Sequence, residues 1–238
     1  MAKVRGRSLR IGLVVAAAVA LAFFLSRNDG DESGASTTTV ANVGMTTVPG
    51  GSITDDVECP PEDGATERII EFSAEPPMCI DESKTYVATI ETSMGTMVAE
   101  LYADKAPRTV NSFVTLARYR YFEGIIFHRV VKDFVIQGGD PTGTGSGGPG
   151  YEFDDELPQA GEYEIGSLAM ANSGPNTNGS QFFIVSSAAG ATRLTPDYSL
   201  FGKVVEGLDV VDEIQNVSTV SDRPEIPVVI NKVTISVK

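Results

Sequence analysis

The sequence predicts a mainly β domain in which short strands close into an antiparallel barrel and two short α-helices cover its ends. From Lys84 onward, runs rich in valine, isoleucine and threonine dominate the chain. Only two stretches repeat apolar residues at helical spacing. Because closure of a sheet removes its unpaired edges, many short strands with two helices favour a barrel.

The strands expected at the two ends of this domain can pair in one sheet. Residues 86–102 contain two β-rich runs that flank the turn sequence SMGT at 93–96, which indicates a hairpin. Near the C-terminus, Val233, Ile235 and Val237 alternate with polar residues, the period of a half-buried strand. We therefore expect the last strand to lie beside this hairpin.

The two expected helices are both short and amphipathic. Pro107 fits the first position of a helix, and apolar residues then recur at 110, 113, 114 and 117. The second helix is predicted from Leu208 to Ile214, with apolar residues at spacings of three. Each helix can therefore bury one face against the barrel.

The 238 residues allow one main domain and a small appendage. We expect the domain at 84–238. Residues 28–58 are rich in serine, threonine and glycine without periodicity, which predicts a flexible linker. Residues 59–83 are rich in proline and acid and predict a cysteine-containing lead-in. A separate partner-binding role for this lead-in is a further hypothesis.

Residues 1–27 predict a signal anchor or a signal peptide. Four basic residues and no acid precede the apolar run IGLVVAAAVALAFFL at 11–25, whose length fits either a short membrane span or a signal-peptide core. Cleavage at the small residues 18–22 would leave Phe23, Phe24 and Leu25 exposed, so an uncleaved single-pass anchor through residues 9–25 is favoured over secretion. The basic N-terminus then stays inside, and the rest of the chain is extracytoplasmic at the cytoplasmic membrane.

After residue 27 the chain is strongly acidic. The remaining 13 basic residues face 32 acidic ones, a formal charge of −19. Such a surface argues against nucleic acid as a partner, because phosphate binding needs a basic face.

The two cysteines, Cys59 and Cys79, both follow the apolar run. In an oxidising compartment they can form a disulfide, while two free thiols are the alternative. Their spacing fits neither a C-x-x-C redox pair nor a zinc site, and His128 is the only histidine, so we expect no metal.

The glycine-rich stretch and the histidine could each suggest catalysis, but a structural role explains both more simply. The glycine-rich sequence GGDPTGTGSGGPG at 138–150 lacks the ending of a phosphate-binding loop and predicts a structural loop. No second imidazole, serine elbow or nucleophilic cysteine accompanies His128, which favours a packed histidine and argues against hydrolysis.

Five ordered motifs carry a resemblance to a known family: KAPRTVNSF, FHRVVKDFVIQGGD, GTGSGGPGYEFDDE, MANSGPNTNGSQFFI and YSLFGKVVEG. Together they resemble the cyclophilin-type peptidyl-prolyl cis-trans isomerases, over about two-thirds of the chain. The resemblance implies an eight-stranded barrel and a monomer without cofactor, and we expect a bacterial, membrane-tethered or secreted member. Its substrates would be proline-containing segments of exported or unfolded proteins, whose folding it would assist.

The isomerase reaction explains the residue types in these motifs. Rotation about an X-Pro bond crosses a barrier of about 18 to 20 kcal/mol set by amide resonance, and no bond is broken. An enzyme must hold the proline ring and favour the twisted amide, whose nitrogen can accept a hydrogen bond. A preorganised arginine can donate it, and no base is needed.

The resemblance implies a role for ten residues. Arg129 takes the place of the catalytic arginine. The substrate-binding positions are Phe134, Val135, Gln137, Ala171, Asn172, Gln181, Phe183, Leu194 and Tyr198. Without the family, Phe134 and Phe183 could equally be ordinary barrel core.

Two departures from the family pattern bear on inhibitors and on function. Arg193 aligns with the usual pocket tryptophan, and Tyr198 with the pocket histidine. Since cyclosporin A binding in the family depends on that tryptophan, we expect it to be weak here. A proline-peptide binding module or chaperone with little turnover is the alternative function, although Arg129 argues for catalysis.

Overall fold

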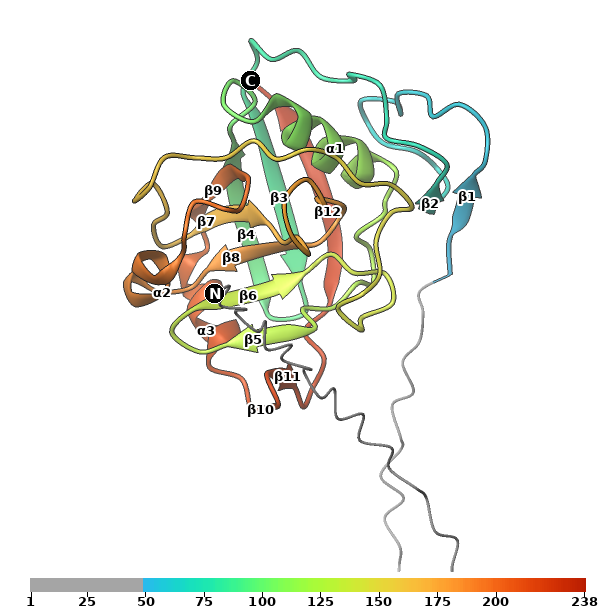
Figure 1. Cartoon of the computed structure of the whole chain (residues 1–238). Helices are drawn as coiled ribbons and strands as arrows, with labels where there is room; N and C mark the ends of the chain where they lie inside the picture. Colours follow the sequence, from blue (N-terminus) through green and yellow to red (C-terminus); the bar gives the residue numbers. More distant parts are fainter. Residues whose placement is uncertain (1–48) are drawn as a thin grey trace, which may run out of the picture. The chain divides into compact units, whose positions relative to one another are not determined.

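The computed structural model describes residues 49–238, which contain one large sheet, two small sheets and three helices (Figure 1). The strands of the large sheet are β3 (Tyr86–Thr92), β4 (Gly95–Leu101), β5 (Arg129–Val131), β6 (Val135–Gly138), β7 (Ser167–Met170), β8 (Phe182–Val185), β9 (Leu200–Glu206) and β12 (Ile230–Val237). Their order is β12-β3-β4-β9-β7-β8-β6-β5, and all the pairings are antiparallel.

The expected closure of this sheet into a barrel is wrong. The edge strands β5 and β12 are not paired with each other, although an isolated bridge between Ile126 and Val229 and three backbone hydrogen bonds join residues 124–127 to residues 228–230. β5 has three residues, and the chain enters it from turns that include Gly124 at a φ of 78°. Val130 N–H in β5 donates to the carbonyl of Asp222 at 2.7 Å, so the free edge of this strand lies against the turn that follows Val220 and not against β12.

The hairpin and the neighbouring last strand are confirmed. β3 and β4 pair from Tyr86↔Leu101 to Thr92↔Gly95, and β12 pairs with β3 along its length. The main core inside the curled sheet is aromatic: Phe113 contacts Phe122, Phe182 and Phe201 at ring-centroid distances of 5.0, 5.6 and 5.2 Å.

Helices α1 (Pro107–Arg118) and α3 (Leu208–Gln215) confirm the two predicted helices, and Figure 1 shows them at opposite ends of the sheet. The third helix, α2 (Ala188–Arg193), was not predicted. Six residues are too few to show a helical period. Its one local signal is Ser187, whose hydroxyl accepts the Gly190 N–H as an N-cap.

Secondary structure already occurs before the expected domain start at Lys84. β1 (Gly51–Ile53), in the range predicted as linker, pairs in parallel with β2 (Ile69–Phe72) in the lead-in. The other small sheet is the hairpin of β10 (Thr219–Val220) and β11 (Arg223–Pro224).

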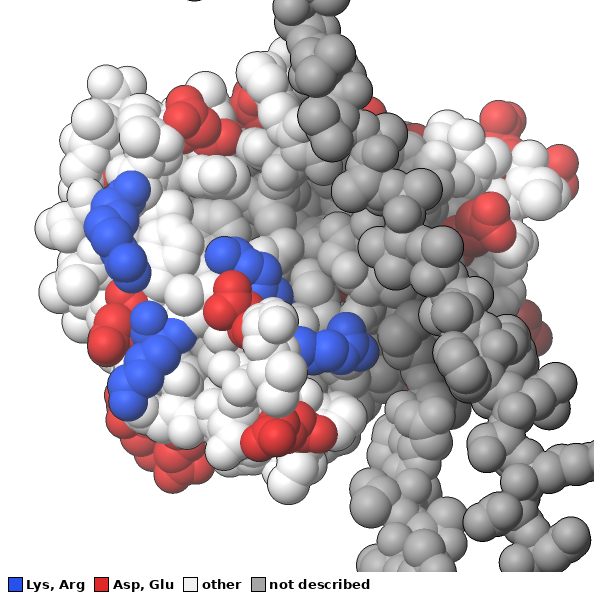
Figure 2. Space-filling view, turned by 60° about the horizontal axis from the view of Figure 1, so that its bottom comes forward, with Lys and Arg blue, Asp and Glu red and all other residues white. Residues whose placement is uncertain are grey.

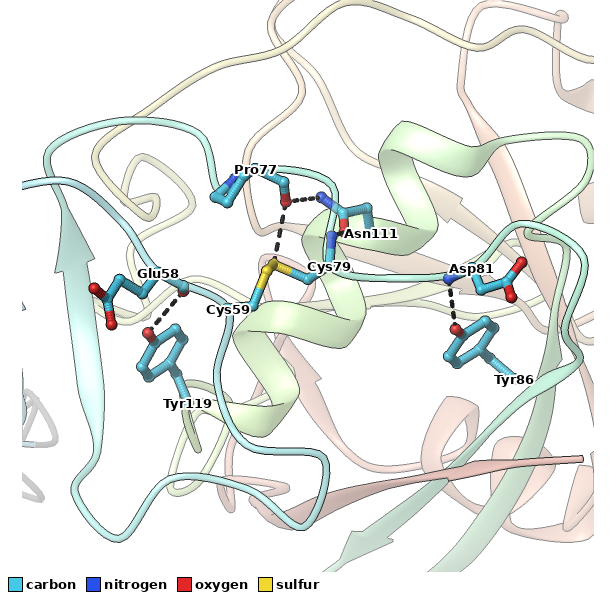
Figure 3. Close-up of a disulfide and its surroundings, with 8 residues drawn as sticks. All are labelled: Glu58, Cys59, Pro77, Cys79, Asp81, Tyr86, Asn111 and Tyr119. Atoms are coloured by element: carbon cyan, nitrogen blue, oxygen red, sulfur yellow. Dashed lines mark hydrogen bonds between the residues drawn. A yellow bond between two sulfur atoms is a disulfide. The ribbon is translucent and has the colours of Figure 1, made fainter.

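The structure joins Cys59 and Cys79 in a disulfide beside α1 (Figure 3). The predicted membrane segment, residues 1–27, lies outside the described residues. Within residues 49–238, no helix is long and apolar enough to cross a membrane.

Candidate active site

Arg129 and Gln137 face each other across β5 and β6, in direct register. Arg129 Nη1 donates to Gln137 Oε1 at 3.4 Å, and Gln137 Nε2 donates to Gln181 Oε1 at 3.0 Å. Gln181 Nε2 in turn donates to the carbonyls of Gly145 and Gly147 at 3.0 and 2.9 Å. This chain of donors and acceptors fixes the orientation of both amide side chains. If either amide group were turned by 180°, two N–H donors would face each other without an acceptor between them.

The Arg129 guanidinium remains accessible. Its side chain is 42% exposed, and Nε lies 3.8 Å from Oδ2 of Asp222 in the turn between β10 and β11. Figure 2 shows basic and acidic side chains next to one another on the face that lies at the bottom of Figure 1. The ion pair is weak at this exposure, so it can orient the guanidinium without blocking its other N–H groups.

Six of the predicted substrate-binding residues gather in one apolar cluster that is separate from the main core: Phe134, Val135, Ala171, Phe183, Leu194 and Tyr198. The alternation along β8 explains the separation. Phe182 and Ile184 point into the main core, whereas Phe183 and Val185 belong to this second cluster. The rings of Phe183 and Tyr198 meet edge to face at a centroid distance of 5.3 Å. Phe134 and Phe183 are therefore not part of the main core.

A groove of about 600 Å³ adjoins this cluster. The predicted residues Gln137, Ala171, Asn172 and Gln181 line it, and Asn172 Nδ2 donates to the carbonyl of Asp197 at 2.9 Å. Residues 145–152 line it as well, and the sequence predicted the part up to Gly150 only as a structural loop. The structure therefore brings the predicted residues together at two adjoining sites, one apolar and one polar.

Asp140, which sequence reasoning missed, organises the groove loop. It is 1% exposed, and its carboxylate accepts the backbone N–H groups of Thr142, Thr144 and Gly147 at 2.7, 3.0 and 3.2 Å. Burial raises the pKa of Asp140, but these hydrogen bonds outweigh it and the pKa is lowered. An aspartate followed by Pro-Thr-Gly is typical of a side chain that caps its own turn, and this signal could have identified it.

Arg193, at the end of α2, occupies the rim of the apolar cluster. Its guanidinium lies 4.6 Å from the ring centroid of Phe134, and Nη2 donates to the carbonyl of Asp133 at 2.6 Å. The backbone of Tyr198 is held in place by Tyr163, whose Oη donates to the Tyr198 carbonyl at 2.6 Å. The cluster therefore has a charged rim and a fixed aromatic wall.

His128 is packed beneath Arg129. It is 7% exposed, and neither of its ring nitrogens makes a hydrogen bond to another described residue. Burial lowers the pKa of His128, opposed in part by the charge of Asp140 and reinforced by Arg223 and Arg129. The imidazole is thus neutral in the folded protein at neutral pH.

We expect the free energy of unfolding to fall as the pH decreases below about 6.5, the ordinary value for histidine. The unfolded chain then binds a proton that the folded chain binds only at lower pH, which favours unfolding. Since the chain has one histidine, denaturant titrations between pH 5 and 8 measure its effect directly. His128→Gln should flatten this dependence, and an equal slope in the variant would assign it to other groups.

The site combines an apolar cluster with a groove lined by amide side chains and backbone, and among residues 49–238 no group of three or more histidine, cysteine or acidic side chains could hold a metal ion. A curled antiparallel sheet that carries an apolar cluster beside a polar groove is the kind of site that can bind an extended peptide. The chain belongs to the family described as cyclophilin type peptidyl-prolyl cis-trans isomerase/CLD, whose model matches residues 87–235.

Relatives with known names agree with this assignment. The chain is 49% identical over 148 residues to peptidyl-prolyl cis-trans isomerase ppi1 of Schizosaccharomyces pombe, covering 60% of this chain and 94% of that protein. It is 50% identical over 140 residues to peptidyl-prolyl cis-trans isomerase-like 1 of Homo sapiens, covering 57% and 83%.

Solved structures show the same fold. A cyclophilin type peptidyl-prolyl cis-trans isomerase of Cryptosporidium parvum matches with a TM-score of 0.60 and 35% identity, covering 64% of this chain and 98% of that one. The structure of that protein in the presence of the dipeptide Ala-Pro matches with a TM-score of 0.59 and 35% identity, covering 63% and 98%. The lead-in lies before the matched family region.

Proposed function

We propose that the chain accelerates rotation about X-Pro bonds by donating a hydrogen bond from Arg129 to the twisted amide. The observation that carries this proposal is that Arg129, whose side chain is 42% exposed, donates to Gln137, which lines the groove, while Val135 on the same strand as Gln137 belongs to the apolar cluster. The proline ring fits the apolar cluster, and the flanking backbone fits the polar groove. No covalent step is required, because the reaction breaks no bond.

The arrangement favours the transition state over the planar amide. As the X-Pro bond twists, the amide nitrogen loses resonance and becomes a hydrogen-bond acceptor, so a donor aimed at it stabilises that state selectively. Each ~1.4 kcal/mol of selective stabilisation accelerates rotation about tenfold. The network from Gln181 through Gln137 to Arg129 supports the donor's orientation before substrate arrives, which reduces the reorganisation needed.

The N-terminal sequence supports a proposal for the site of action. The basic residues and the apolar run at 11–25 support a single-pass anchor in the cytoplasmic membrane of a bacterium, or secretion if the segment is cleaved. The substrates would then be proline-containing segments of exported proteins, which a monomeric domain meets as they emerge. Intact-mass measurement of the exported protein tests the anchor, since a mass that lacks the residues before Phe23 would replace it with a secreted form.

An exchange experiment tests the isomerase against the binding module. NMR exchange spectroscopy of an Ala-Pro peptide with the chain from Asn28 onward should show faster cis-trans exchange than in the peptide alone. Concentration-dependent shifts of the peptide without faster exchange would instead establish a proline-peptide binding module.

We expect cyclosporin A to inhibit weakly. Arg193 presents a guanidinium over Phe134 where the family pattern has tryptophan, and burying that charge under an apolar macrocycle is costly. An inhibition titration should show residual activity at stoichiometric drug, and Arg193→Trp should bind the drug at least tenfold more tightly, worth ~1.4 kcal/mol. Complete inhibition of the unaltered protein at stoichiometric drug would contradict this expectation.

A further inference from the structure

The lead-in, residues 59–83, touches the back of the groove through Phe72. Phe72 is 2% exposed, and its N–H donates to the carbonyl of Pro149 at 2.8 Å. The approach is close, since a Cβ on Gly150 would lie 2.4 Å from the Phe72 carbonyl oxygen. Gly150 also has a φ of 98°, which favours glycine. Because Pro149 and Gly150 line the groove, this contact fixes part of its wall.

The Phe72 ring supports the same wall from behind. It meets Tyr151 edge to face at a centroid distance of 6.3 Å and Tyr121 at 6.4 Å. Tyr151 lines the groove, and Tyr121 Oη is 2.7 Å from Oγ of Ser180, another lining residue. Removing the ring would therefore free two side chains that define the shape of the groove.

A second contact ties the lead-in to the chain beyond the groove loop. Glu75 accepts from Arg108 Nε and Nη2, both at 2.6 Å, and Arg108 Nη1 donates to Asp154 at 2.9 Å. Arg108 lies in the first turn of α1, and Asp154 follows the loop that lines the groove. The two-pronged ion pair between Arg108 and Glu75 therefore holds the lead-in in a fixed position relative to α1 and to the segment at Asp154.

The disulfide joins Cys59, the first residue of the lead-in, to Cys79 near its end, and hydrogen bonds connect this region to α1 (Figure 3). Cys79 N–H donates to Oδ1 of Asn111 at 2.6 Å, and Asn111 Nδ2 donates to the Pro77 carbonyl at 2.9 Å. At the other end, Tyr119 Oη donates to the Glu58 carbonyl at 2.9 Å. Closing this loop lowers the entropic cost of keeping Phe72 in place.

We propose that the lead-in positions the groove of the isomerase, with Phe72 as the positioning residue and the Cys59–Cys79 disulfide as its clasp. The lead-in sets the affinity for peptide residues that lie in the groove, away from the proline ring. It makes no described hydrogen bond to the apolar cluster or to Arg129, Gln137 or Gln181, so we expect its main effect on peptide affinity and not on the rate of rotation. This inference rests on the groove being the peptide-binding surface proposed above.

Kinetics with a short and a long peptide test the proposal in the full chain. The short peptide is an Ala-Pro tetrapeptide, and the long one extends it by several residues on each side. Phe72→Ala should raise KM for the long peptide about tenfold, equivalent to ~1.4 kcal/mol, and leave kcat and the short-peptide KM unchanged. Phe72→Leu should recover most of the affinity.

Ile80→Ala is the matched control, because Ile80 is an equally apolar buried residue of the lead-in without a hydrogen bond to the groove loop. It should lower Tm and leave both KM values unchanged. Equal KM changes for both peptides in Phe72→Ala, or the same KM split in Ile80→Ala, would overturn the proposal.

Reduction provides a second test that does not depend on a variant folding. Dithiothreitol supplies two electrons and two protons, breaks the S–S bond to give two thiols, and becomes a cyclic disulfide. Cys59 is exposed, so the reagent can reach it. The amide signals of Gly147, Gly148 and Gly150 should then shift and the long-peptide KM should rise. Unchanged signals and KM in the fully reduced chain would overturn the proposal.

These outcomes separate the inference from the function on which it rests. If the unaltered chain accelerates neither peptide, the isomerase proposal fails, and the shifts of the groove amides still decide whether the lead-in positions the loop. If it accelerates both peptides and reduction changes neither KM nor shifts, only the inference fails.

Discussion

Replacing Arg129 with alanine is expected to lower kcat/KM for an Ala-Pro peptide by about 10²–10³, or ~3–4 kcal/mol of transition-state stabilisation. The loss should fall mainly on kcat, because the proposed hydrogen bond forms only as the amide twists. NMR exchange spectroscopy at saturating and limiting peptide gives both constants. The variant should still fold, because the Arg129 side chain is 42% exposed and its ion pair with Asp222, at 3.8 Å, contributes little to stability.

Two further variants sharpen this test. Arg129→Lys keeps the charge but loses the forked guanidinium, so it cannot donate to Gln137 and the substrate together in the same geometry, and we expect most of the activity to be lost. Lys132→Ala removes an exposed cation three residues along the chain and should keep full activity. Activity retained in Arg129→Ala would refute the proposed mechanism.

Asp140→Asn is expected to lower the free energy of unfolding by about 3 kcal/mol, and Tm by about 10 °C. The substitution replaces one carboxylate oxygen by an NH₂ group, which must then face either the N–H of Thr142, now bound to Oδ1, or the N–H groups of Thr144 and Gly147, now bound to Oδ2. Loss of this anchor should also loosen the loop whose carbonyls hold Gln181, so KM should rise as well. Thermal unfolding and peptide kinetics measure the two effects.

The pH dependence gives an independent check on Asp140. Because its pKa is lowered in the folded protein, its contribution is present above about pH 4 and is lost as the pH falls through the lowered value. The stability difference between the two proteins should therefore shrink in acid. Asp104→Asn, at an exposed position, should change stability by less than about 0.5 kcal/mol. A similar loss in both variants would show that the buried anchor is not the cause.

Local patterns were enough for much of the fold and for the composition of the site. Pro107 marks the first residue of α1, and the hairpin expected at SMGT is present, with Ser93 and Met94 between β3 and β4. The motifs around Arg129 and Phe183 identified residues that meet in space although they lie on different strands. The helix start, the hairpin and the site residues could be predicted because each depends on a few neighbouring residues, or on a motif that specifies one backbone geometry.

Features that depend on distant contacts could not be found in this way. α2 has six residues and no period, and the open edge between β5 and β12 depends on how the whole sheet curls. The pattern around Asp140 was interpreted as a loop, and its role as an anchor appears only when the amides of residues 142–147 turn toward it. In each case the relevant energy comes from groups that folding brings together.

The amino-acid order thus identifies the family and the periodicities that form strands and helices, and it predicts Arg129 as the catalytic arginine, since all of these depend on short-range patterns. The attachment of the lead-in to the groove belongs to the folded molecule. Phe72 lies 77 residues from Pro149 in the chain, yet its N–H reaches that carbonyl at 2.8 Å. Apolar burial and backbone hydrogen bonding favour this pairing over other pairings only in the folded chain, where all the possible partner surfaces are present. A local sequence pattern carries no information about those distant partners.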